Sequence, residues 1–383
     1  MRLGCSGTQQ QETEFDLVNP VETSGAEIGT VTYEDIAREC GVGKSTVHRA
    51  LNEAWQGGKK TRAAILACAK RLGYHPFSHQ AARRMAYRRH GKSMLNHMVA
   101  LFLPVNFQRY PYYREILQGV LDAMVEQGYD LIVSYDRESG PSPMPRSMVS
   151  GEVDGAILNS DVSLDDMRRL PGFASRPVVG LLQPSPNCSS VAADDWSAAS
   201  MALGHLLDLG HRHVLHFYEE RSDYYSEQRL SGYRNACLQR GLNPSDVLIL
   251  CPPIKPWTTD PFTAAWVTEA IPRTLNAFPQ VTAILARQDE DAVVIHDVLT
   301  RNGLRVPKDI SLVGCDDVRP IAGAQCLNIL TTVNLSLHDV GQEAGRMLIN
   351  LIERRSHCES RVTVPASLVV RGSTAPPRGG KTP

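Results

Sequence analysis

Residues 31–52 read VTYEDIARECGVGKSTVHRALN, and this stretch predicts two short helices joined by a tight turn. Thr32 can cap the first helix, with Asp35 three positions later near the positive N-terminal end of that helix. Gly41 provides a chain reversal that needs a positive φ angle, and apolar residues at helical spacing continue on both sides of it. The segment therefore predicts a helix-turn-helix, whose second helix enters the major groove of DNA.

Five polar side chains are left on the outer face of the second predicted helix: Lys44, Ser45, Thr46, His48 and Arg49. A polar and basic set at the start of a helix is suited to base edges and phosphates. An ordinary helical hairpin with a solvated face is the plainer alternative. Because spacing, turn and charge agree with one another, we favour DNA binding.

Charge is distributed unevenly along the 383 residues, although the formal net charge of the whole chain is −1. Residues 31–92 carry thirteen Lys and Arg against four Asp and Glu, which gives this segment a local charge of +9. The remainder of the chain is therefore close to −10. A basic head on an acidic body predicts a polyanionic partner for the head alone.

Cysteine content and hydropathy indicate the compartment. The nine cysteines form no C-x-x-C motif and no His/Cys cluster, so we expect reduced thiols, no metal site and no cofactor. No run of about 18 apolar residues is present, and the N-terminus has no apolar signal region. We therefore expect a cytoplasmic, nucleoid-associated protein without membrane contact. Residues 1–28 lack periodicity, and we expect them to be a disordered tail.

The character of the chain changes at Met98. Compact, β-rich apolar runs such as VALFLPV, VDGAILN and DISLVGCD alternate with helical stretches from there onward. Near-continuous apolar strands between amphipathic helices predict doubly wound parallel sheets. About 275 residues of this pattern exceed one such unit. We therefore expect two α/β lobes, with a cleft between them at the carboxyl ends of the strands.

An ordered set of motifs runs through the head and the body. The head reads VT-x-x-D-I-A-x-x-x-GV-x-x-ST-V-x-R-x-LN, followed by K-T-R and LGY-x-P. The body continues with YPYY at 110–113, HLLDLGHRHV at 205–214, QRLSGYRNA at 228–236, GLRVPKDISLVGCDD at 303–317 and LTTVNLS at 330–336. In sequence and order these motifs resemble the lactose/galactose repressor (LacI/GalR) family of bacterial transcription regulators. The similarity covers about 340 of the 383 residues.

The resemblance implies a homodimer or larger assembly that binds a pseudo-palindromic DNA operator. It also implies a core of two lobes, like that of periplasmic binding proteins, that binds a small effector such as a sugar. The expected organisation is a helix-turn-helix domain at 29–76, a hinge helix or linker at 77–95, an effector-binding core at 96–373 and a disordered tail at 374–383. The first lobe is expected to comprise about 96–194 and 333–355, and the second about 195–332 and 356–373.

The resemblance also assigns DNA contacts residue by residue. The positions that fall where the family reads bases are Lys44, Ser45 and Arg49. Those that fall near phosphates are Tyr33 and Thr46, and the expected contact set is completed by Thr32 and His48. Gly43 and His48 stand where the family usually has serine. Glycine forfeits a hydroxyl contact to phosphate, whereas histidine can donate to a guanine, so both changes predict a non-standard operator half-site.

The hinge departs further from the family pattern, which is Pro-Asn followed by Ala-Arg-x-Leu. Ala82-Arg83-Arg84-Met85 is the best match, but it lies two residues farther from Pro76 than usual. We favour Met85 as the apolar side chain that enters a base step from the minor groove. If the spacing is fixed instead, Arg83 takes that place and senses minor-groove width through its charge. A plain basic linker is the third interpretation.

A sugar site needs an aromatic face and a few charged or amide groups that bind hydroxyls. Strand ends and family positions give these candidates: Tyr112, Tyr113, Asn159, Arg229, Trp257, Gln288 and Asp316. Tyr113 is equally compatible with a place in the core, and Trp257 with the packing of a loop. Leu182-Gln183 stands where many relatives have Asp-Arg, which weakens any assignment to a particular hexose.

Other classes of function fit the sequence less well. The glycine-rich phosphate loops and the G-x-S-x-G motif of hydrolases are absent, which argues against an enzyme. A solute-binding transport protein would need a signal peptide and no basic head. Within regulation, repression is favoured over activation because a roadblock needs only occupancy of the operator. A nucleobase is the alternative to a sugar as the effector.

Overall fold

The computed structural model divides the chain into two compact units, residues 1–94 and 95–383. The structure describes residues 31–51, 55, 57–72, 74, 95–104, 107–135, 152–159, 176–184, 188–219, 224–254, 262–323, 327–353 and 360–378. The predicted tail at 1–28 and residues 77–94 of the predicted hinge lie outside these ranges. Of the helices in the described ranges, none is both long and apolar enough to cross a membrane.

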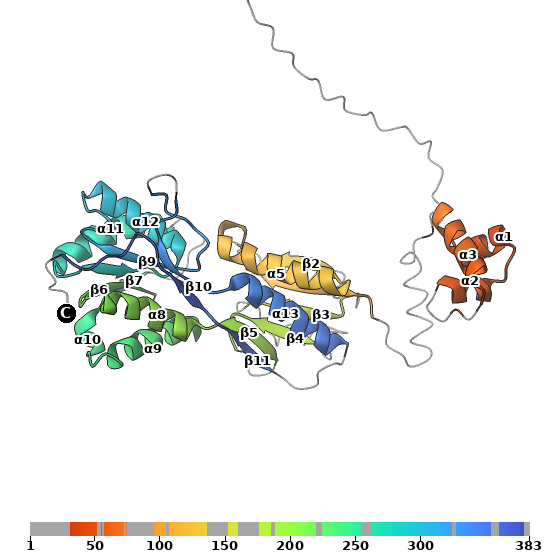
Figure 1. The fold of residues 1–383 in the computed structure, drawn as a ribbon, viewed down its shortest axis with the longest axis horizontal. Coiled ribbons are helices and arrows are strands. Elements are labelled where there is room, and N and C mark those ends of the chain that lie inside the picture. Colours follow the sequence, from red (N-terminus) through yellow and green to blue (C-terminus); the bar gives the residue numbers. More distant parts are fainter. Residues whose placement is uncertain are drawn as a thin grey trace, which may run out of the picture. The chain divides into compact units, whose positions relative to one another are not determined.

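The first unit contains α1 (Tyr33–Cys40), α2 (Lys44–Leu51) and α3 (Lys59–Arg71) (Figure 1). Each helix contributes apolar side chains to one small core, in which Ile36, Val47 and Ile65 are at most 1% exposed. The apolar residues recur at three- and four-residue intervals, so each helix buries a single face. The remaining faces are left to polar and basic side chains.

The predicted cap and turn of the helix-turn-helix are confirmed. The Thr32 hydroxyl accepts the Asp35 backbone N–H at 3.3 Å, and the Asp35 carboxylate accepts the Thr32 backbone N–H at 2.9 Å. This reciprocal pair satisfies two donors at the start of α1. Gly41 ends α1 with φ 62°, a left-handed conformation that favours glycine.

The second unit contains two six-stranded sheets. The first sheet has the order β11-β5-β4-β3-β1-β2, and every pair of neighbouring strands in it is parallel. Its strands are β1 (Met98–Leu103), β2 (Asp130–Tyr135), β3 (Gly155–Leu158), β4 (Val178–Leu181), β5 (Ser189–Ala193) and β11 (Arg361–Val364). Helices α5 (Pro111–Gln127) and α13 (Leu337–Ile352) pack against each other and against this sheet (Figure 1).

The second sheet has the order β12-β10-β9-β8-β6-β7, and only β12 is antiparallel to its neighbour. Its strands are β6 (Val214–Glu219), β7 (Leu248–Ile254), β8 (Ala283–Leu285), β9 (Ser311–Cys315), β10 (Thr331–Asn334) and β12 (Ser367–Val369). One face is covered by α8 (Asp195–Asp208) and α9 (Tyr224–Leu238), and the other by α11 (Phe262–Ala277) and α12 (Asp289–Arg301) (Figure 1). A short α10 (Pro244–Val247) leads into β7.

The expected α/β architecture of two doubly wound parallel lobes is therefore present, but one predicted lobe boundary is wrong. The prediction places residues 356–373 in the second lobe, whereas β11 at 361–364 pairs in parallel with β5 of the first sheet. The chain crosses into the second lobe only before β12, which starts at Ser367. Short strands of four and three residues on either side of the crossing give no local signal that separates one sheet from the other.

The predicted disordered tail at 374–383 is also wrong for its first half. Residues 374–378 lie against the second lobe, where the Ala375 carbonyl accepts the His211 Nε2–H at 2.9 Å. His211 is 1% exposed and its Nδ1 lies 2.8 Å from the Thr282 hydroxyl, so it is a buried polar link at the end of α8. Ser373 is fully buried, and its hydroxyl donates to the Leu312 carbonyl at 2.6 Å. Long-range hydrogen bonds therefore hold a segment that has no hydrophobic periodicity.

Candidate functional site

Helix α2 presents the predicted base-reading side chains on its outer face. Lys44, Ser45, His48 and Arg49 are exposed, whereas Val47 points into the core of the first unit. The expected separation of an apolar and a polar face is therefore confirmed for this helix. The DNA contacts themselves stay a prediction.

Weak contacts orient the exposed side chains of α2. Lys44 Nζ lies 2.8 Å from a carboxylate oxygen of Glu34, and this contact lowers the Glu34 pKa. The Arg49 Nε donates to the Ser45 carbonyl at 3.4 Å. The His48 ring lies edge-on to Tyr33, with 5.7 Å between the ring centroids. Exposed contacts of this kind add little stability, so these side chains can exchange them for phosphates and bases at small cost.

The two residues that precede the helices have different roles. The Thr32 hydroxyl is already committed to Asp35, to whose carboxylate it donates at 2.7 Å, so the structure gives it a capping role. Gly43 begins α2 through its carbonyl, which accepts the N–H groups of Thr46 and Val47 at 2.8 and 3.1 Å. A Cβ added at Gly43 would have its nearest neighbours 3.9 Å away, so a serine would fit there. Arg83 and Met85, the predicted hinge contacts, lie outside the described residues.

Arg229 on α9 is the centre of the predicted effector site. Its Nε donates to the Asp195 carboxylate at 2.6 Å, and its Nη1 donates to the Arg287 carbonyl, also at 2.6 Å. The guanidinium carbon lies 6.0 Å from the centroid of the Tyr225 ring. Contacts from α8, α9 and the loop after β8 therefore fix the position of this guanidinium.

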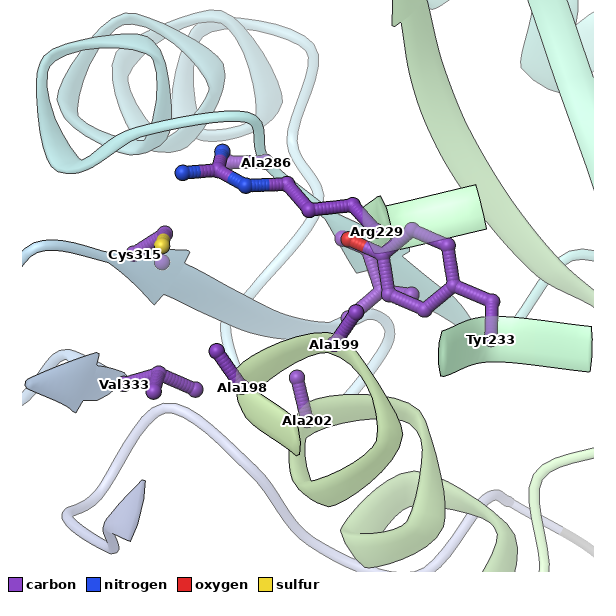
Figure 2. Close-up of a pocket in the computed structure, with 10 residues that line it drawn as sticks. Ala198, Ala199, Ala202, Arg229, Tyr233, Ala286, Cys315 and Val333 are labelled. Atoms are coloured by element: carbon purple, nitrogen blue, oxygen red, sulfur yellow. The ribbon is translucent and has the colours of Figure 1, made fainter. Parts of the chain in front are cut away.

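A small pocket lies beside Arg229 (Figure 2). Figure 2 shows the Arg229 side chain reaching from α9 past Ala286, with Cys315 and Val333 on neighbouring strands. The lining consists of Ala198, Ala199, Ala202, Arg229, Tyr233, Leu285, Ala286, Gly314, Cys315 and Val333. Small and apolar side chains thus surround one charged group, a composition typical of a small-molecule site.

Asp316 follows β9 with φ 102°, an unusual conformation for a residue with a side chain. Its backbone N–H donates to the Val333 carbonyl at 2.8 Å, which fixes the turn. Burial raises the Asp316 pKa well above its usual range, although the nearby Arg229 opposes this rise. Strained backbone and a buried acid near Arg229 are typical of a functional position.

Tyr112 brings the first lobe to this site. Burial raises the Tyr112 pKa well above its usual range, and Tyr113, Asp316 and Tyr225 add to the rise, so these groups lie within electrostatic reach of it. Its ring centroid is 3.9 Å from that of Tyr113. Tyr113 is 9% exposed and belongs to the apolar core, so of the two tyrosines Tyr112 is better placed to contact a ligand.

The remaining predicted residues are less closely tied to Arg229. Asn159, at the carboxyl end of β3, is 2% exposed, and neither atom of its amide has a hydrogen-bond partner among the described residues. Gln288 is the half-buried N-cap residue of α12, next to the Arg287 whose carbonyl binds Arg229. Trp257 lies outside the described residues.

Sequence reasoning missed Asp195, the partner of Arg229. Two acids begin α8, and either could be interpreted as a cap. Asp194 is the cap, because its carboxylate accepts the Ser197 backbone N–H at 2.9 Å. Asp195 therefore does not have that role, and it lies 6% exposed within the lobe. The only available signal was an acid directly after a capping acid in an otherwise apolar helix.

In a comparison with known proteins, each of the two units matches a family model. Residues 32–76 match the family model "Bacterial regulatory proteins, lacI family", and residues 203–374 match "Periplasmic binding protein-like domain". The "HTH-type transcriptional regulator CelR" of Thermobifida fusca is 29% identical over 350 residues, which cover 89% of this chain and 98% of the relative.

Two solved structures share the architecture. One, a transcriptional regulator CelR–cellobiose complex, has 27% identity and a TM-score of 0.59, and the match covers 90% of this chain and 99% of that one. The other, a lac repressor dimer bound to operator and the anti-inducer ONPF, has 22% identity and a TM-score of 0.69, over 91% of this chain and 100% of that one. At 22% identity, the second likeness concerns the fold alone.

Proposed function

The chain belongs to the lacI family of bacterial regulatory proteins, and from this premise we propose that it is a transcriptional repressor controlled by a small molecule. It binds a pseudo-palindromic DNA operator as a homodimer. A ligand in the cleft between the two lobes changes the affinity for that operator. The protein is thus a regulator and not an enzyme, and its place is on chromosomal DNA in the nucleoid.

The observation that carries this proposal is the presence of two different polar sites in one chain. Helix α2 exposes Lys44 and Arg49 in the first unit, whereas in the second unit the buried Asp316 lies near Arg229 and within electrostatic reach of Tyr112 from the other lobe. An exposed basic face suits a large polyanion. A buried polar cluster beside an apolar cavity suits a small ligand.

We assign the DNA contacts as the sequence predicts them. Lys44, Ser45 and Arg49 read bases, and His48 alters the preferred half-site. The remaining assigned contacts are Thr32, Tyr33 and Thr46 in the head, and Arg83 and Met85 in the hinge.

A saccharide is the proposed class of effector. The related CelR structure contains cellobiose, and this chain has an aromatic ring at Tyr112 within electrostatic reach of a carboxyl group that itself lies near a guanidinium. Aromatic faces and paired polar groups are suited to sugar rings and hydroxyls. Asn159 and Gln288 are candidates for further hydroxyl contacts. A nucleobase is the second candidate, since an aromatic ring can stack on a base as well.

Two experiments test the proposal. The first selects bound fragments from random DNA and measures their affinity by fluorescence anisotropy at increasing salt. Affinity should fall steeply because several phosphates are neutralised, and a flat salt dependence would contradict DNA binding. The second measures thermal shifts with saccharides and nucleobases, since a bound ligand stabilises the fold by mass action. A shift with nucleobases alone would replace the saccharide assignment.

A further inference from the structure

Arg229 and Asp195 form an ion pair that is largely shielded from solvent. The side chains are 18% and 7% exposed, and the Nε–Oδ1 distance is 2.6 Å. Arg229 makes a second hydrogen bond, in which its Nη1 donates to the Arg287 carbonyl. Arginine has five N–H donors, so three of them make no hydrogen bond within the described residues.

The neighbouring cation is neutralised in the same way. Arg287 lies 2.6 Å from Asp291, and these side chains are 15% and 2% exposed. Asp316 adds a further buried carboxyl group, and in the described part of the chain it has no cation at ion-pair distance. Within those residues the site therefore offers hydrogen-bond donors but no uncompensated positive charge.

We propose that Asp195 is a specificity-determining residue, which makes this site select uncharged, hydroxyl-bearing ligands over anionic analogues such as sugar phosphates and sugar acids. An anion that enters a buried site loses its hydration, and an unpaired cation is the single group that compensates this loss most strongly. Asp195 neutralises the positive charge of the Arg229 guanidinium. The remaining N–H groups of Arg229 are still available to the oxygens of a neutral ligand. This inference rests on the proposed function only in taking the Arg229 site as the effector site.

Replacement of Asp195 by asparagine removes the negative charge of the side chain and keeps its size and shape. The asparagine side chain keeps an oxygen that can accept from Arg229 Nε, so the guanidinium stays in place with its charge uncompensated. Asp194→Asn is the matched control, because Asp194 lies one residue earlier at the same helix end. It has the same formal charge, and its carboxylate accepts hydrogen bonds from Ser197 and not from Arg229.

The test measures thermal stability of the full chain with inorganic phosphate, against potassium chloride at the same ionic strength. We expect no phosphate-specific shift for the wild-type chain or Asp194→Asn. Asp195→Asn should bind phosphate about tenfold or more tightly than the wild type, because a buried unpaired guanidinium strongly favours an anion. Asp195→Ser also removes the charge and replaces the asparagine variant if that does not fold.

Two results would overturn the proposal: a phosphate shift in the wild type as large as in the variant, or no shift in either folded Asp195 variant. Glucose and glucose 6-phosphate give an independent readout on the wild-type chain, and tighter binding of the phosphate ester would also overturn it. If the phosphate shifts appear but neither a saccharide nor a nucleobase changes operator affinity, the charge role stands and the proposed function fails.

Discussion

The outer face of α2 and the Arg229 site hold their polar groups in opposite ways. On α2 the basic side chains are exposed, and Lys44 and its partner Glu34 are 61% and 65% exposed. Arg229 and Asp195 are 18% and 7% exposed and are linked to three elements of the second lobe. Surface pairs contribute little to stability, whereas a broken buried pair leaves a desolvated charge. DNA preference can therefore change with little effect on folding, but the proposed effector site is tied to the stability of its lobe.

The largest expected effect is the loss of the buried pair. Arg229→Gln should lower the free energy of unfolding by about 3–5 kcal/mol, because Asp195 would remain buried without its cation. Urea unfolding of the full chain measures this change. Arg346→Ala is the control, since Arg346 pairs with Glu126 at 3.0 Å with both side chains about half exposed. It should cost less than about 1 kcal/mol, and equal losses would remove the contrast between buried and exposed pairs.

The second expected effect is a pH dependence of stability, and it arises from a buried histidine in the second lobe. His216 on β6 is 7% exposed, its Nδ1 has no hydrogen-bond partner among the described residues, and burial lowers its pKa to about 3. Between about pH 6.5 and 3 the unfolded chain binds a proton that the folded chain does not. Stability should therefore fall as the pH decreases through this window, by up to about 1.4 kcal/mol per pH unit.

His216→Gln should reduce that slope, because glutamine does not titrate. Urea unfolding at about pH 7 and pH 5 compares the two chains on either side of the ordinary histidine pKa. Parallel losses of stability in the wild type and the variant would show that His216 does not supply the acid sensitivity.

The third expected effect concerns the exposed outer face of α2. Arg49→Ala should weaken operator binding by about 1–3 kcal/mol, because it removes an arginine that we propose to contact a base. Its side chain is exposed, so the unfolding free energy should change by less than about 0.5 kcal/mol. Fluorescence anisotropy and thermal melting measure the two quantities. Arg301→Ala, an exposed arginine of the second unit, should leave operator affinity unchanged.

The smallest effect is expected at the start of α2. Gly43→Ser should stabilise the first unit by a few tenths of a kcal/mol, since serine is the better N-cap and the site has room for it. Thermal melting of the full chain, followed in the first unit, detects the change. A destabilised variant would show that the backbone at Gly43 needs glycine.

The sequence predicts those parts of the molecule that depend on local spacing. Thr32, Asp35 and Gly41 carry cap and turn signals within ten residues, so the helix-turn-helix was predictable in detail. The alternation of strands and helices likewise predicts two parallel lobes. For the candidate site, Arg229 and Asp316 are near each other as the resemblance implies.

Features that depend on distant contacts were not predictable in the same way. The pairing of β11 with β5 joins residues about 170 positions apart, and nothing in RVTV selects one sheet over the other. The segment around Ser373 and Ala375 is held by hydrogen bonds to His211 and Ser311 and not by an apolar face. The Asp195–Arg229 pair joins positions on two helices, and no motif contains both.

The central claim is that one ligand site controls the DNA affinity of the head. The direct test is an anisotropy titration of the full chain on its selected operator, with and without a saccharide that stabilises the protein in a thermal-shift assay. A coupling of typical size predicts a change in operator Kd of about 5–150-fold. A saccharide that stabilises the protein but leaves the operator Kd unchanged would contradict the claim.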